Sequence, residues 1–422
     1  MFKKIISIFI LSTISISFII GQDKIEITKD YTKSGSFARL KSMGENPLIT
    51  DPTDLMTNPA LGNKFSNMLY GDLGTTIASN FGSGGLGQYF TANFSLSNNF
   101  TLGATLARKD FSGVLSISNL DPFGLVRESN SLLQGVGLVE MDNNWALISS
   151  YKLGNHTLGF GISYASTTAE SRPANGGANE GFASQLGLNV GYFGKINSRI
   201  SLELSGVLLY PHATYKTPQS SQTKFNQSIV SLSGRAYYKT NSKFTIVPYG
   251  KGFKASGTAD LGDENGVTST DLPSYLSITF GIGVMYKLGN FLFAGGPSFG
   301  YLQEKTPAVA GVAPVLTKNT TSFPMWNVGA EWQILNWLVG RIGYKSRTST
   351  VSTETVASLT NTNETIVTSF EPVNGGLTLG VGFRFSGLFI DATVNEDILR
   401  QGLNNLGGGG ATFAYVSAGY LF

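Results

Sequence analysis

The sequence predicts an all-β fold, a transmembrane antiparallel β-barrel of about 14–16 strands with an N-terminal plug. Three observations lead to this fold class. Charged residues make up only 14% of the 422 residues, whereas soluble proteins carry about 25%. No internal stretch reaches the ~18 consecutive apolar residues of a membrane-spanning helix. Most of the chain instead alternates apolar and polar residues, as a wall between lipid and a lumen requires.

The N-terminal residues are expected to be a secretory signal peptide. Lys3 and Lys4 precede an apolar stretch at 5–20, and Gly21 is a small residue at a suitable cleavage point. No Cys occurs in the chain, so lipoprotein processing is not expected. The expected organisation is a signal peptide at 1–21, a hatch or plug segment at 22–65 and a β-barrel at 66–422. The expected location is the bacterial outer membrane.

The strand pattern is clearest at 276–286. One face consists of Leu276, Ile278, Phe280, Ile282, Val284 and Tyr286. The intervening residues are mainly Ser, Thr and Gly, which are too small to cover an exterior. We therefore expect the apolar face to point outward to lipid and the small polar face to line the lumen.

Short turns and long loops set the expected strand count. Seven short segments rich in Asn and Gly tolerate the positive φ of tight hairpins, namely 97–99, 153–156, 195–198, 240–242, 288–290, 335–336 and 386–387. Longer polar stretches lie between them, beginning with 119–143, and are expected to be extracellular loops. Seven short turns with a strand at either end predict sixteen strands. Fourteen is the alternative, because the first two strands, about 66–80 and 87–97, are the least regular.

The final strand carries an expected assembly signal. Val416, Ala418, Tyr420 and Phe422 share one apolar face and end the chain on an aromatic residue. This pattern resembles the C-terminal signal by which bacterial outer-membrane barrels are recognised, with Tyr420 and Phe422 as its aromatic residues. The barrel assembly machinery is therefore an expected partner.

Residues 22–65 lack the alternation and carry a different pattern. Ala38-Arg39 and Met43-Gly44 are followed by Asp51-Pro52-Thr53 and then by Asn58-Pro59-Ala60. This order resembles the FadL superfamily of outer-membrane fatty-acid transporters, which includes PorV-type subunits of the type IX secretion system. The resemblance implies a hatch folded inside a barrel of fourteen strands. From the residues alone, Asn58 satisfies backbone groups of a turn and Pro59 fixes φ, so an ordinary turn before strand one is the alternative.

Sparse charges fall on the expected lumen face. By parity these are Glu203, Arg235, Glu331, Arg341, Lys345, Arg384 and Asp391. An Arg or Lys facing lipid at mid-membrane would cost about 2–4 kcal/mol, which favours inward placement. One interpretation is that they pair with one another or anchor the hatch. The other is that Arg235, Arg341 or Arg384 binds a ligand carboxylate.

Catalysis has little support in the residue inventory. The chain has no Cys and two His, and His156 and His212 lie in different parts of the predicted barrel. Triads and metal sites need more than this, so no enzymatic activity, cofactor or metal is expected. The net charge of +3 includes Lys3 and Lys4 of the signal peptide, so no nucleic-acid partner is expected.

The function that we expect is passive uptake of hydrophobic small molecules such as long-chain fatty acids. The alternative is a PorV-like subunit of a type IX secretion system that binds secreted cargo proteins. Outer-membrane lipid and a hydrophobic ligand are the expected partners in the first case. By analogy with the transporters, Pro248 or Pro297 is expected to mark a side exit in the wall.

Overall fold

The computed structural model describes residues 35–73, 89–107, 115–126, 141, 144–171, 177–217, 222–263, 266–307, 315–358, 361–394 and 413–422. The expected signal peptide and residues 22–34 of the expected hatch lie outside this part of the chain, as does most of the stretch 119–143. Among the described residues, no helix is long and apolar enough to cross a membrane.

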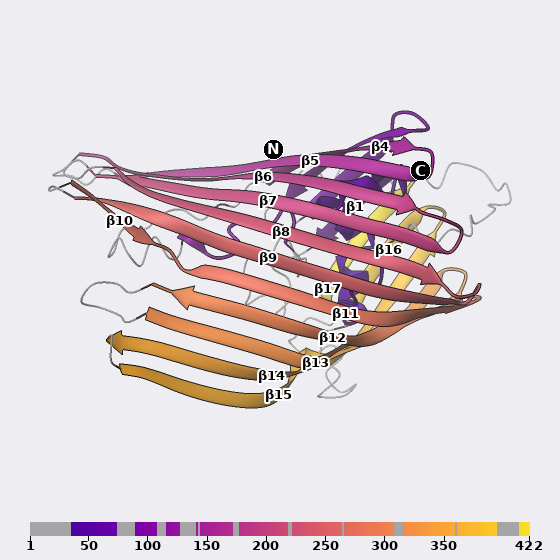
Figure 1. Ribbon diagram of the computed structural model, residues 1–422. Coiled ribbons are helices and arrows are strands. Elements are labelled where there is room, and N and C mark those ends of the chain that lie inside the picture. Colours follow the sequence, from indigo (N-terminus) through magenta and orange to yellow (C-terminus); the bar gives the residue numbers. More distant parts are fainter. Residues whose placement is uncertain are drawn as a thin grey trace. The chain divides into compact units, whose positions relative to one another are not determined.

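The described chain forms one antiparallel sheet that closes on itself (Figure 1). Its strands are β1 (Met68–Leu73), β2 (Tyr89–Ser95), β3 (Phe100–Ala107), β4 (Asn144–Leu153), β5 (His156–Ser171), β6 (Asn179–Lys195), β7 (Ile200–Lys216), β8 (Thr223–Lys239), β9 (Phe244–Asp263), β10 (Gly266–Asp271), β11 (Ser274–Leu288), β12 (Phe291–Thr306), β13 (Val315–Leu335), β14 (Leu338–Ser358), β15 (Asn361–Phe385), β16 (Leu388–Val394) and β17 (Phe413–Leu421). The ring closes where β17 pairs with β1, from Met68↔Leu421 to Leu73↔Val416.

Sixteen strands make up the wall. The sheet has seventeen described strands, but β10 pairs only with the far half of β9, and β9 itself pairs directly with β11. Removing β10 from seventeen leaves sixteen. The sequence-based count of sixteen is thus confirmed, and the fourteen strands implied by the family resemblance are not found here.

The short turns lie where the sequence predicts them. Gly154 and Gly289 adopt φ of 59° and 55°, and Ser386 and Gly387 adopt φ of 43° and 89°. These values lie in the left-handed region that Gly and small polar residues enter most readily. Each of these turns therefore joins neighbouring strands without a loop.

The apolar face of the wall points outward, as predicted. Along β11, Leu276, Ile278, Phe280 and Ile282 are 37%, 48%, 55% and 53% exposed. A row of exposed large apolar side chains is unfavourable in water. The exterior of this wall is therefore built to contact lipid.

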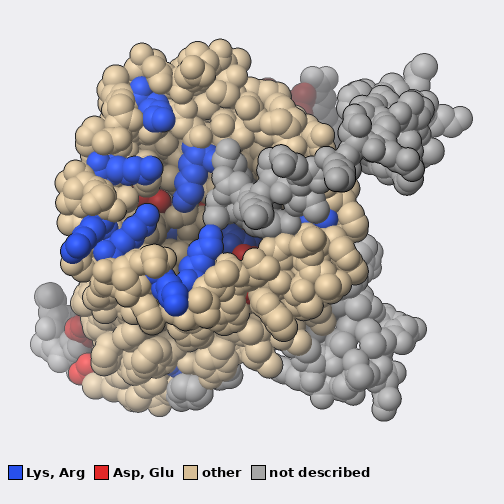
Figure 2. Space-filling model, turned by 90° about the vertical axis from the view of Figure 1, so that its right-hand side faces the viewer, with Lys and Arg blue, Asp and Glu red and all other residues tan. Residues whose placement is uncertain are grey.

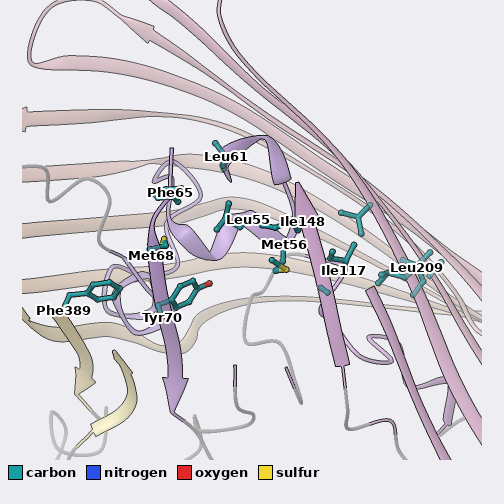
Figure 3. Close-up of a cluster of buried hydrophobic side chains, with 14 residues drawn as sticks. Leu55, Met56, Leu61, Phe65, Met68, Tyr70, Ile117, Ile148, Leu209 and Phe389 are labelled. Atoms are coloured by element: carbon teal, nitrogen blue, oxygen red, sulfur yellow. The ribbon is translucent and has the colours of Figure 1, made fainter. Parts of the chain in front are cut away.

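An N-terminal segment precedes β1 and lies inside the barrel. We call residues 35–67 the inner segment; it contains α2 (Phe37–Ser42), η1 (Pro52–Met56) and η2 (Pro59–Asn63). The helix α2 contacts β14–β17, whereas η2 contacts β3–β6 on another part of the ring. Leu55, Met56 and Leu61 are buried against inward-facing wall residues such as Ile148 and Leu209 (Figure 3).

Part of the stretch 119–143, expected to be an extracellular loop, folds inward instead. Residues 115–126 enter the barrel, where the Ile117 N–H donates to the carbonyl of Met56 at 3.2 Å. Leu125 and Val126 are buried beside Tyr215 and Phe225. The expectation was wrong for 119–126 because these apolar side chains find their partners on distant strands, which local polarity does not reveal.

The wall is not opened at the two prolines that were expected to mark a side exit. The pairing of β8 with β9 skips two pairs beside Pro248 and resumes without a register shift, and the pairing of β11 with β12 behaves likewise at Pro297. Shifts occur elsewhere, in β13 between Ser322 and Met325, and where Tyr344↔Leu377 is followed by Ser346↔Pro372. These bulges bend the strands locally.

Candidate functional site in the barrel lumen

Each short helix of the inner segment begins at a polar cap. The Ser36 hydroxyl accepts from the N–H of Arg39 at 3.3 Å, and Asp51 forms a capping box with Asp54. In the Asn-Pro-Ala motif, the side chain of Asn58 accepts from the N–H of Ala60 at 3.2 Å, and Pro59 occupies the first helical position. Such caps satisfy donors at the start of a helix, so the motif fixes the start of η2.

Two wall glycines form the seat of this motif. Gly159 of β5 and Gly191 of β6 lie opposite each other. A Cβ on Gly159 would overlap the backbone of Pro59 and Ala60, and one on Gly191 would overlap the side chain of Asn58. Glycine is therefore required here so that the backbone of η2 can approach the wall.

A first group of buried charges joins α2 to β13–β16. Arg39 binds Asp51 at 3.0 Å and Glu331 at 2.8 Å. Arg341 binds Glu331 at 2.6 Å and Asp391 at 2.8 Å, and Arg384 also binds Asp391 at 2.8 Å. Three arginines thus balance three carboxylates. The hydroxyl of Ser36 donates to Asp391 at 3.0 Å and ties the start of α2 to β16.

A second group joins η1 to β7 and β8. The guanidinium of Arg235 lies 2.8 Å from Asp54 and 2.7 Å from Glu203, and it donates to the carbonyl of Ile49 at 3.0 Å. Glu203 also accepts from the hydroxyl of Tyr237 at 3.1 Å. Because burying an ion requires that its bonding groups be satisfied, this group holds the inner segment in one position.

A third group centres on Glu45, which pairs with Lys41 and with Lys345 of β14. Burial would raise the pKa of Glu45, but Lys41 and Lys345 outweigh burial and lower that pKa to about 2. At Asp51 the balance differs, because burial raises its pKa to about 6 against the opposing effect of Arg39. Glu45 is therefore a strongly held anion, whereas Asp51 is less easily ionised.

A cavity of about 340 Å³ lies between the inner segment and the wall from β7 to β14. Its apolar lining includes Phe37, Leu40, Ile49, Tyr249 and Met325. This volume falls in the usual range of small-molecule sites, ~300–1,000 Å³. The arrangement provides an apolar chamber with a few polar groups.

One cation of the cavity, Lys251 of β9, forms no direct ion pair within the described residues, and Glu45 acts on it only at longer range. Lys251 lines the cavity and makes no hydrogen bond or ion pair with any other residue in the described ranges. By contrast, Lys345 and Arg235 are both paired with carboxylates. Because an unpaired charge away from bulk water is costly, Lys251 is suited to meet an anionic group that enters the cavity.

The structure places all the sequence-predicted lumen charges on the inner face. Arg235 and Glu331 pair with charged residues of the inner segment, and Asp391 accepts a hydrogen bond from Ser36 of the same segment. The three arginines considered for a ligand carboxylate, Arg235, Arg341 and Arg384, are all engaged with protein carboxylates.

Sequence reasoning missed Lys251. Its neighbours on the outward face of β9 are Gly250 and Gly252. Because neither is a large apolar residue, the sequence does not show which face of this strand points to lipid. The pairing of β8 with β9 would have revealed it, because the inward Arg235 lies opposite Tyr249. Alternate residues of β9 counted from Tyr249 then face inward, namely Val247, Tyr249, Lys251, Phe253 and Ala255.

Comparison with known proteins gives likenesses in fold. No family model and no curated protein matches the chain. Among solved structures, it is similar to a Pseudomonas aeruginosa FadL homologue, with 13% identity, a TM-score of 0.41, and coverage of 90% of this chain and 96% of that one. It is also similar to the P. putida toluene transporter TodX, with 12% identity, a TM-score of 0.34, and coverage of 92% and 99%.

A third similar structure is the FrpB iron transporter from Neisseria meningitidis (F3-3 variant), with 11% identity and a TM-score of 0.40. The alignment covers 82% of this chain and 63% of FrpB, so the chain spans less than two thirds of that transporter.

The closed antiparallel wall, its apolar exterior and its charged interior define a transmembrane β-barrel of the bacterial outer-membrane type.

Proposed function

We propose that the protein mediates passive uptake of hydrophobic small molecules, such as long-chain fatty acids, across the outer membrane. The observation that carries this proposal is the cavity inside the barrel, with its apolar lining and the unpaired Lys251. An amphiphilic acid would place its chain against residues such as Phe37 and Met325 and its carboxylate beside Lys251. No enzymatic step is proposed.

Passage requires the inner segment to move, because it lies inside the barrel and is tied to the wall by the three groups of ion pairs. The cavity lies between these ties, so a bound molecule would contact both the segment and the wall. The proposed order is entry from outside, binding in the cavity, and release after a local shift of the inner segment.

The test is ligand binding and uptake by Lys251→Met. A charge-assisted hydrogen bond contributes about 1.5–3 kcal/mol, so we expect the variant to bind a fluorescent fatty acid about ten- to a hundredfold more weakly. Binding of the matching fatty alcohol should change little. The matched control is Lys254→Met, on the same strand at an exposed, outward position.

Uptake of labelled fatty acid in a strain that lacks the gene supplies the second measurement. Restoration by the wild-type protein but not by Lys251→Met is expected. Unimpaired uptake without the protein would rule out the proposed function, and equal fatty-acid affinity of wild type and Lys251→Met would rule out the role of Lys251.

A further inference from the structure

Lysines recur at one structural position around the end of the barrel that carries the short turns. There the backbone N–H near the end of a strand donates to a carbonyl of the neighbouring turn. Lys152 donates to Asn99 at 2.7 Å, Lys195 to Asn155 at 2.9 Å, Lys239 to Arg199 at 2.8 Å and Lys287 to Lys243 at 2.9 Å. We call Lys152, Lys195, Lys239 and Lys287 the mouth ring.

The mouth ring has the parity of the lumen face. Lys152 lies between Tyr151 and Leu153, whose outward side chains are 49% and 53% exposed, and successive strand residues point to opposite faces. The other three lysines hold the equivalent position on β6, β8 and β11, and all four are exposed. Figure 2 shows Lys and Arg gathered around the hollow at this end.

The short turns at this end carry charge of one sign. The turns 96–99, 154–155, 196–199, 240–243, 289–290, 336–337 and 386–387 contain no Asp or Glu, and Arg199 and Lys243 add two cations. Neighbouring members of the ring lie two wall strands apart, or about 10 Å. This spacing is close to the screening length of ~8 Å at physiological salt, so their potentials add across the mouth.

The distance between the lysines of the mouth ring and their inward placement decide which kind of anionic partner fits them. A single small anion would reach at most two lysines that are about 10 Å apart. Lipid headgroups lie outside the wall, whereas the ring faces inward. An extended surface with several carboxylates matches all four positions. Short turns lie on the periplasmic side of outer-membrane barrels. We propose that the mouth ring docks the acidic surface of a periplasmic protein; this docking site is separate from the ligand cavity.

Binding of a defined acidic probe tests the proposal. Fluorescent poly-L-glutamate is titrated into the full-length protein in phosphatidylcholine nanodiscs at two salt concentrations. We expect the variant K152Q/K195Q/K239Q/K287Q to lose at least about tenfold in affinity and most of the salt dependence. The two halves, K152Q/K195Q and K239Q/K287Q, should each lose part of the affinity, which keeps the test usable if the fourfold variant does not fold.

The matched control removes the same charge elsewhere. The variant K216Q/K224Q/K254Q/K305Q changes four exposed lysines away from the short turns and should keep its affinity for poly-L-glutamate. Equal losses in the two fourfold variants, or no binding by the wild type, would overturn the proposal. Ring-dependent binding of phosphatidylglycerol vesicles without binding of poly-L-glutamate would assign the ring to lipid instead. Fatty-acid binding should be unchanged in the ring variants, which separates this test from that of the cavity.

Discussion

The charged residues of the lumen act as fixed ties rather than as a mobile lining. Arg341 and Asp391 have no exposed side-chain surface, and each has more than one charged partner. Removing one member of such a set leaves its partner buried and unpaired, which typically costs about 3–5 kcal/mol. Lys251 differs because no protein carboxylate binds it within the described chain, and this contrast singles it out for ligand binding.

Glu45 gives a pH dependence at the residue scale. Its pKa is lowered from 4.5 to about 2, so folding favours its ionised form. The stabilisation is fully present above pH 4.5 and is lost as the pH falls through about 2. We expect the inner segment of the wild type to become more accessible to pepsin between pH 4.5 and 2, beyond any change in Glu45→Gln. Identical pH profiles for the two proteins would contradict this role.

At the scale of elements, η2 packs closely against the wall because the wall residues beneath it are glycines. Gly159→Ala places a Cβ against the backbone of Pro59 and Ala60. We expect η2 to be displaced, and trypsin to cleave faster at Lys64, which follows it. Gly206→Ala is the control, because its Cβ would lie 3.4 Å from its nearest neighbour, an ordinary contact. Equal cleavage rates at Lys64 in the two variants would show that the wall strand shifts to accommodate the Cβ at position 159 and that η2 stays in place.

The sequence predicts elements well where local geometry decides them. Asn and Gly mark the turns, and alternation marks β11 and its outward face. Residues 119–126 were assigned to the outside because their burial depends on Tyr215 and Phe225, far along the chain. The same limit applies to the lumen: parity placed Arg235 and Glu203 inside, but the ion pair of Arg235 with Asp54 depends on how the inner segment folds.

For the whole molecule, closure of the ring depends on a single seam between the first and last strands. Leu69 of β1 lies directly opposite Tyr420 of β17. Opposed residues of antiparallel strands have Cα atoms ~4.5–5.5 Å apart, within the range that a disulfide spans. The chain has no Cys, so L69C/Y420C introduces the only pair. We expect oxidation to crosslink the seam, and the denatured chain to migrate faster on a non-reducing gel because it remains circular.

The control for the seam is L69C/L421C, in which the second Cys lies one residue from the register and points to the opposite face. It should not crosslink while the barrel is folded. A crosslink in L69C/L421C but not in L69C/Y420C would show that β17 is shifted by one residue against β1. Such a shift would turn the apolar face of β17, which includes Tyr420, away from lipid. The crosslink therefore tests both the register of this seam and the outward placement of Tyr420.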